Sequence, residues 1–269
     1  MKNYFLLFCL VIVNYNCFAQ HKLTYDYTYY YDSLRPTNVI ANEVAVIHTM
    51  DERLYFEVNK IKKTEVDYLA WKNKEDPQVT WEKQGNIPYS KLNNYLIQDN
   101  NGISIFHSST DLFISKLNLD DTQQWILSDT KHENSNLKKA MTTYLGRNWV
   151  AWYDETIPIN DGPFLFKGLP GLIVELQDDR GYFHWKLVSY KLNYDDNNYT
   201  REILNFRLPK ANAINEKDFQ KRLIDDFYNP GYAIQSSGIV VEEEKMKKMV
   251  EFRKSQIHRY LIPDLWTYL

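Results

Sequence analysis

The chain has 269 residues, with 32 basic and 35 acidic side chains and a formal net charge of −3. No arginine-rich run occurs, which argues against nucleic acid as a partner, because nucleic-acid-binding proteins usually carry a basic face. The 21 tyrosines and 7 tryptophans, against 9 glycines and 9 prolines, favour a β-rich fold, since aromatic side chains suit half-buried strands.

Residues 1–19 have the pattern of a secretory signal peptide. Lys2 supplies the positive charge, residues 4–13 form the apolar core, and small side chains at the −3 and −1 positions end with Ala19. The apolar core is about half of the roughly 20 residues that a membrane-spanning helix needs. We therefore expect a protein exported to the periplasm or the medium of a Gram-negative bacterium, with no membrane span after cleavage.

Both cysteines, Cys9 and Cys17, lie within that segment. Tyr15 and Asn16 stand where a lipoprotein signal has small residues, so we do not expect lipid attachment at Cys17. The mature chain would then have no disulfide, no thiolate metal site and no cysteine nucleophile.

Alternation of apolar and polar residues predicts strands over much of residues 20–210. The pattern begins at residues 21–32, and residues 43–50 and 53–58 are expected to pair antiparallel across a tight link. Residues 59–100 are polar and give no clear pattern. Further strands are predicted at residues 102–109, 112–117, 123–130, 138–146 and 148–154.

The clearest hairpin is predicted at residues 172–192, with its turn at residues 178–181. Short strands joined by turns, without helical periods between them, indicate an antiparallel sheet. The predicted fold is mainly β (α+β), a curved antiparallel sheet or half-barrel.

Two helices are predicted in the C-terminal region, about residues 211–269. The first would bury Phe219, Leu223 and Phe227, and the second Met246, Met249, Val250 and Ile257. These residues are too few for a core of their own, so we expect both helices to pack on the sheet. Residues 20–269 are accordingly predicted to form a single domain.

The segment Gly162 to Trp185 contains two Pro-Gly signals, Gly162-Pro163 and Pro170-Gly171. We expect a type II turn in which Gly171 has positive φ, with Gly168 allowing another backbone to approach closely. A phosphate-binding loop usually precedes a helix, whereas a strand-like run follows here. The segment is therefore interpreted as the corner of a sheet.

The same segment resembles the GLPGLI family of exported bacterial proteins. The hexapeptide matches letter for letter, and the flanking Gly146-Arg147, Ala151-Trp152-Tyr153 and Ile157-Pro158 match as well. The resemblance implies a location in the cell envelope, but no activity. The motif residues are Gly162, Pro163, Gly168, Leu169, Pro170, Gly171, Leu172 and Ile173.

Sequence motifs for common reactions are missing, among them G-x-S-x-G, H-E-x-x-H and the Walker and dinucleotide loops. No two histidines are expected to meet on one predicted face, so we predict no metal site, and we predict no cofactor. A carboxylate-dependent hydrolase is kept as one alternative function. Its candidate residues are Asp154, Glu155, Asp161, Glu175, Asp178 and Asp179.

The function that these observations favour is a non-enzymatic binding or carrier module. Its ligand would be apolar or amphipathic, such as a lipid, or its partner an envelope protein, bound in the concavity of the sheet. The aromatic residues expected to face the ligand are Trp149, Trp152, Phe183 and Trp185. An assembly or scaffold protein of the envelope is the other alternative.

Overall fold

The computed structural model describes residues 20–30, 37, 39–90, 92, 94–108, 112–117, 122–132, 136–221 and 240–255. The predicted signal peptide lies outside these residues, as do Leu223, Phe227 and Ile257 of the predicted C-terminal helices. Within the described ranges, no helix is long and apolar enough to cross a membrane.

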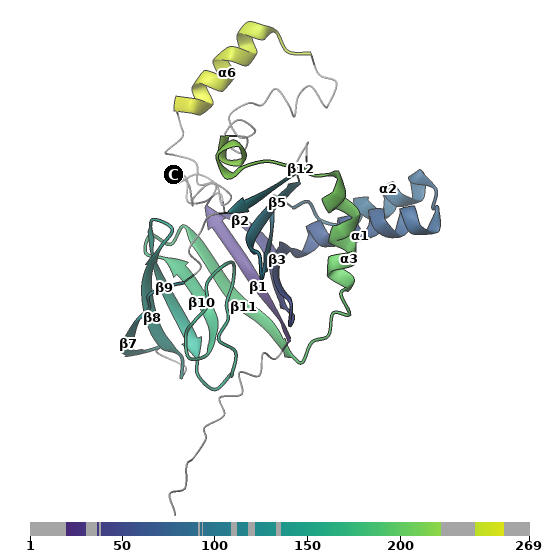
Figure 1. The fold of residues 1–269 in the computed structure, drawn as a ribbon. Coiled ribbons are helices and arrows are strands. Elements are labelled where there is room, and N and C mark those ends of the chain that lie inside the picture. Colours follow the sequence, from purple (N-terminus) through teal and green to yellow (C-terminus); the bar gives the residue numbers. More distant parts are fainter. Residues whose placement is uncertain are drawn as a thin grey trace, which may run out of the picture.

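An open sheet of 12 strands dominates the fold (Figure 1). The strand order is β12-β6-β5-β4-β3-β2-β1-β11-β10-β9-β8-β7. Neighbours pair antiparallel except β12 and β6, which are parallel, so the predicted mainly antiparallel β fold is confirmed. The strands are β1 (His21–Tyr30), β2 (Val39–His48), β3 (Glu52–Glu57), β4 (Asn94–Asp99), β5 (Gly102–Ser108), β6 (Leu112–Leu117), β7 (Ile126–Lys131), β8 (Lys138–Tyr144), β9 (Arg147–Asp154), β10 (Leu172–Asp178), β11 (Phe183–Leu192) and β12 (Asn212–Ala213).

Two antiparallel meanders meet at the centre of this sheet. Strands β1 to β6 follow one another in space, as do β7 to β11, and β1 pairs with β11 to join them. In this pair Tyr27 lies opposite Trp185, and their rings stack with centroids 4.4 Å apart. The predicted 172–192 hairpin is confirmed as β10 and β11.

Three helices lie where the sequence had predicted none. They are α1 (Val58–Asn73), α2 (Pro77–Gly85) and α3 (Tyr199–Arg207), followed by the short 3-10 helix η1 (Leu208–Lys210). The prediction of sheet throughout 20–210 is therefore wrong in these segments. The capping residues were readable: Asp76 accepts a hydrogen bond from the amide of Gln78, and proline occupies the first turn of α2.

The core lies on both faces of the central strands. On one face, Leu23, Tyr25 and Val44 pack with side chains from the segment that precedes β10. On the other, Ile47 packs with Ile61 of α1 and with Leu204 of α3. The end of β2 is consequently buried on both faces, which explains why residues 44–47 form a continuous apolar run.

The C-terminal region differs from the prediction in part. Phe219 is 1% exposed and lies edge-on to His107 of β5, so it does cover the sheet. Helix α6 (Glu243–Ser255) stands apart from the sheet in Figure 1. Met249, predicted to be packed, is 39% exposed, because α6 presents it to solvent. The single-domain organisation stays a prediction.

His107 makes the stability of this core dependent on pH. Burial, with a smaller effect from Lys60, lowers the pKa of His107 to about 4 from 6.5. The unfolded chain therefore binds a proton that the folded chain excludes, and stability present above pH 6.5 is lost as the pH falls towards 4. We expect a loss of about 1.4 kcal/mol per pH unit in this window.

The comparison of wild type with His107→Gln isolates this contribution. Urea unfolding at pH 4.5 to 7.5 should show a steeper loss in the wild type than in the variant. Parallel pH profiles for the two proteins would contradict the assignment.

Candidate functional site

Residues 155–171, termed here the motif loop, connect β9 to β10 and cross one face of the sheet. Leu165, Phe166 and Leu169 are each at most 1% exposed. The Phe166 ring packs against Trp149, with ring centroids 4.8 Å apart, and near Trp185, with centroids 6.4 Å apart. The motif loop is thus part of the hydrophobic core.

The two glycines of the motif have roles opposite to those predicted. Gly168 has a φ of +90°, whereas the φ of Gly171 is not positive. The predicted type II turn is therefore wrong. A Cβ on Gly171 would lie 2.2 Å from the carbonyl oxygen of Asp154. Gly171 is therefore required for close backbone approach between the motif loop and the end of β9. The corner interpretation agrees with this geometry, because β10 begins at Leu172.

Alanine substitution separates these two roles. Gly171→Ala should cost about 3 kcal/mol or more, because the added methyl collides with backbone that cannot move without displacing β9. Gly168→Ala should cost about 1 kcal/mol, because its Cβ has space and only the backbone conformation is strained. Thermal or chemical unfolding measures both, and an equal loss in the two variants would refute the close-approach role.

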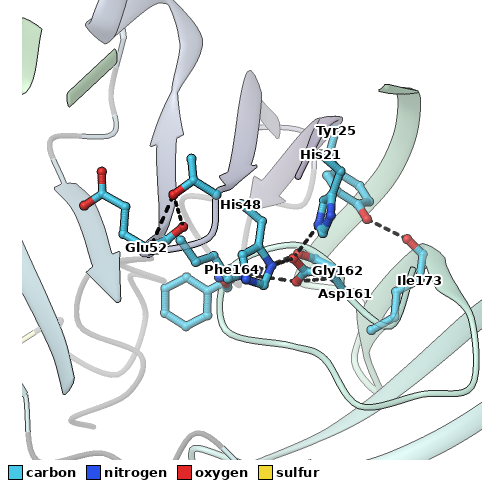
Figure 2. A network of polar contacts seen from close by, with 10 residues as sticks. His21, Tyr25, His48, Glu52, Asp161, Gly162, Phe164 and Ile173 are labelled. Atoms are coloured by element: carbon cyan, nitrogen blue, oxygen red, sulfur yellow. Dashed lines mark hydrogen bonds and ion pairs between the residues drawn. The ribbon is translucent and has the colours of Figure 1, made fainter. Parts of the chain in front are cut away.

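A buried polar cluster fixes the start of the motif loop to the sheet (Figure 2). The Asp161 cluster comprises His21, His48, Arg53 and Asp161. Oxygen Oδ2 of Asp161 lies 2.9 Å from His21 Nε2 and 3.2 Å from His48 Nδ1. Arg53 Nε donates to Oδ1 and Oδ2 of the same carboxylate, at 3.0 and 3.2 Å. One carboxylate thus accepts hydrogen bonds from three strands.

Arg53 also holds the backbone of the motif loop. Its Nη2 donates to the carbonyl of Gly162 at 2.7 Å, and its Nη1 donates to the carbonyl of Phe164. The side chains of Arg53 and Asp161 are both only 4% exposed. The guanidinium therefore satisfies a buried charge and two loop carbonyls together, which a lysine could not do with the same geometry.

The strand register explains why these residues meet. His21 of β1 is directly opposite His48 of β2, and His48 is directly opposite Arg53 of β3. Directly opposed residues in an antiparallel sheet point to the same face. The expectation that the histidines do not meet on one face is therefore wrong, since the rings of His21 and His48 have centroids 5.0 Å apart.

The electrostatics favour an ionised carboxylate inside the protein. Burial alone would raise the pKa of Asp161, but the Arg53 guanidinium and the hydrogen bonds from His21 and His48 outweigh it and hold that pKa well below its usual range. Burial, and to a lesser extent the Asp161 carboxylate, raises the pKa of Tyr25 well above 10. Tyr25 thus keeps its proton and donates it to the carbonyl of Ile173 at 2.6 Å, which ties β1 to β10.

The four aromatic residues predicted to face a ligand are not members of this cluster. Trp149, Phe183 and Trp185 are at most 1% exposed within the core, which leaves them no surface for a ligand in this state. Trp152 is half-buried and packs edge-on to His132, with ring centroids 5.1 Å apart.

Each of the six candidate hydrolase carboxylates has its own partner among the described contacts. Asp161 belongs to the Asp161 cluster, and Asp178 pairs with Arg147 at 3.1 Å. The remaining partners are Lys138 for Glu155, His184 for Glu175, Asn148 for Asp179 and Thr156 for Asp154.

Comparison with known proteins bears on the same region. One family model matches it. That family is described as "Protein of unknown function (Porph_ging)", and its match covers residues 107–175, which include the motif hexapeptide at 168–173. No curated protein matches the chain.

Two solved structures show a distant likeness at 16% sequence identity. "Structure of PNGF-II in P21 space group" has a TM-score of 0.46 and covers 76% of this chain and 32% of that one. "Structure of PNGF-II in C2 space group" has a TM-score of 0.43 and covers 87% of this chain and 33% of that one. The chain thus spans about a third of the length of these proteins.

Substitution of Arg53 measures how much the Asp161 cluster stabilises the fold. Arg53→Met should lower the free energy of unfolding by about 3–5 kcal/mol, because it leaves the Asp161 charge buried without its main partner. Arg207→Met is the matched control. It removes a 2.7 Å ion pair with Asp67 whose side chains are 31% and 27% exposed, and it should cost less than about 1 kcal/mol.

Chemical unfolding of both variants gives the answer. Similar losses for Arg53→Met and Arg207→Met would contradict a dominant structural role for the cluster.

Proposed function

We propose that this chain is an exported, non-enzymatic binding module of the bacterial cell envelope that recognises a partner protein through its α1–α2 hairpin. The signal-peptide pattern of residues 1–19 and the GLPGLI-type hexapeptide at 168–173 support export. The family matched at residues 107–175 has no described function, so the binding role rests on the surface of the protein.

The observation that carries the proposal is that α2 buries none of its side chains. Helices normally pack an apolar face on the core, and this one is held instead by its caps and by polar contacts to α1 and to the link between α1 and α2. Lys83 pairs with Glu75 at 2.6 Å, and Gln84 donates to Asp67 at 2.5 Å. The helix nevertheless exposes apolar side chains, since Val79 is 42% exposed and Trp81 71% exposed.

Neighbouring residues extend the apolar character of this hairpin. Trp71 of α1 is 66% exposed, and Tyr89, just after α2, is 77% exposed. Figure 1 shows α1 and α2 projecting away from the sheet, where a partner can reach them. Exposed tryptophan and tyrosine are the residue types that dominate binding energy in protein interfaces.

Charge favours a protein over a lipid surface as the partner. Residues 58–85 contain six lysines and five acidic residues, which is close to neutral. A helix that binds anionic membranes usually carries a clear basic excess. The interior offers less to a lipid, because Leu165, Phe166 and Leu169 of the motif loop already fill the space over the sheet.

A matched pair of double variants tests the proposal. Val79→Ser with Trp81→Ser removes the apolar side chains of α2. Val188→Ser with Tyr190→Ser removes an aliphatic and an aromatic side chain of β11 that are 54% and 46% exposed. Wild type should capture a specific protein from envelope extract of its own bacterium. The hairpin variant should bind that protein at least about 30-fold more weakly, the effect of losing one interface hot spot.

The β11 variant should bind like wild type, and both variants should keep the wild-type melting temperature to within a few degrees. Equal capture by all three proteins would refute the hairpin as the binding surface. A wild-type chain that enriches no envelope protein over an unrelated exported control would refute the binding function itself.

A further inference from the structure

We infer that His21, His48 and Asp161 form a binding site for a divalent first-row transition-metal ion of the Zn²⁺ class. Each residue offers one ligand atom, and the three atoms lie within 4.8 Å of one another. Two imidazoles and one carboxylate form a recognised ligand set for such ions. This inference is independent of the α1–α2 hairpin and of any partner protein.

Two of the three distances between ligand atoms are close to those that a bound ion requires. With metal–ligand bonds of about 2.0–2.1 Å in a tetrahedral site, neighbouring ligand atoms are roughly 3.3 Å apart. The Asp161 oxygen Oδ2 lies 2.9 Å from His21 Nε2 and 3.2 Å from His48 Nδ1. These two distances need to lengthen by only a few tenths of an ångström, with the ion replacing the two hydrogen-bond protons. The two histidine nitrogens lie within 4.8 Å of one another and need to come closer by up to about 1.5 Å, which a rotation of the partly exposed His48 ring can provide.

The surroundings supply the outer contacts that metal ligands need. Arg53 holds both oxygens of Asp161 and fixes the carboxylate plane, as hydrogen-bonding partners of ligating carboxylates do in metal sites. Its positive charge also opposes a second cation nearby, so the site is expected to bind less tightly than a site without that arginine.

Access from solvent runs past His48. The side chain of His48 is 31% exposed, whereas those of His21 and Asp161 are 7% and 4% exposed. An ion can thus enter at His48 and be held by the two buried ligands. The three ligands come from β1, β2 and the motif loop, so a bound ion would link the loop to the sheet more strongly than hydrogen bonds alone.

The chain offers a matched control in His184. It pairs with a single carboxylate, Glu175, at 2.7 Å, and its side chain is 33% exposed, almost the same as His48. A histidine–carboxylate pair without a second imidazole should not hold the ion. His184→Gln therefore controls for the general loss of a half-exposed imidazole.

The test uses metal-stripped protein and Zn²⁺ alone as the probe. The chain is purified in the form that cells export, and where the N-terminal segment is retained, Cys9→Ser and Cys17→Ser remove competing thiolates. Equilibrium dialysis with metal analysis should find one Zn²⁺ per wild-type chain at micromolar Zn²⁺. His21→Gln and His48→Gln should each weaken binding at least tenfold, whereas His184→Gln should leave it unchanged.

Two further readouts do not depend on dialysis. Zn²⁺ should raise the melting temperature of wild type and of His184→Gln, because an ion that binds the folded chain stabilises it, and this rise should be absent in His48→Gln. Co²⁺ in place of Zn²⁺ should give the visible absorption of a low-coordinate site. The exposed position of His48 makes its variant the one most able to fold, so a failure of His21→Gln to fold leaves the test intact.

Three results would overturn the inference. The first is a wild-type chain that binds no Zn²⁺ under these conditions. The second is binding that His48→Gln leaves unaltered. The third is a loss in His184→Gln as large as that in His48→Gln.

Discussion

The arrangement of β1, β2, β3 and the motif loop depends on one buried negative charge, the carboxylate of Asp161. A buried carboxylate costs several kcal/mol unless opposite charge and hydrogen bonds compensate it. Here Arg53 provides the charge, and two histidines complete the hydrogen bonding. Because these three partners lie on β1, β2 and β3, the compensation works only when all three strands hold their observed register. A shift of one residue in β2 would turn His48 to the opposite face.

The motif loop follows from the same constraint. Near Asp161, Arg53 donates hydrogen bonds to two carbonyls of the loop. At the other end, Gly171 lets the chain pass close to the backbone of Asp154 before β10 begins. Between these two attachments, Phe166 and its apolar neighbours pack against the tryptophans of the sheet. The hexapeptide of the sequence is thus one end of a loop that is fixed at both ends.

Features that arise from neighbouring residues in the sequence could be predicted, whereas features that arise from contacts between distant residues could not. Alternation within a strand located most of β1, β2, β3 and the β10–β11 hairpin, because the signal is local. Helix α1 could not be recognised because it buries only Ile61, Thr64 and Tyr68, and the many polar residues between them hide the helical period. The Asp161 cluster was missed because His21 and Asp161 are 140 positions apart. Pairing β1 with β2 from residue 21 to residue 48 would have revealed the two histidines.

The exchange of roles between Gly168 and Gly171 has a similar cause. A Pro-Gly pair is a reasonable signal for a type II turn, but the need for a glycine at position 171 arises from the backbone at Asp154, which no local pattern contains. The exposed side chains of α2 pose the reverse problem. A tryptophan in a polar segment gives no sign of its exposure until the helix that carries it is seen to bury nothing.

The pairing of β1 with β11 has a consequence for how the chain becomes native. Tyr27 and Trp185 are opposed at the centre of the sheet, although strands β2 to β10 all lie between them in the sequence. Contacts between distant segments form slowly, because a long loop must be closed first. Each meander can assemble by itself, but until they dock, β1 and β11 are both unprotected edges rich in tyrosine and tryptophan, and such edges invite association with other chains. A partly assembled chain is therefore most vulnerable to aggregation at the strands that later form the middle of its sheet, and a chaperone would protect it best by covering β1.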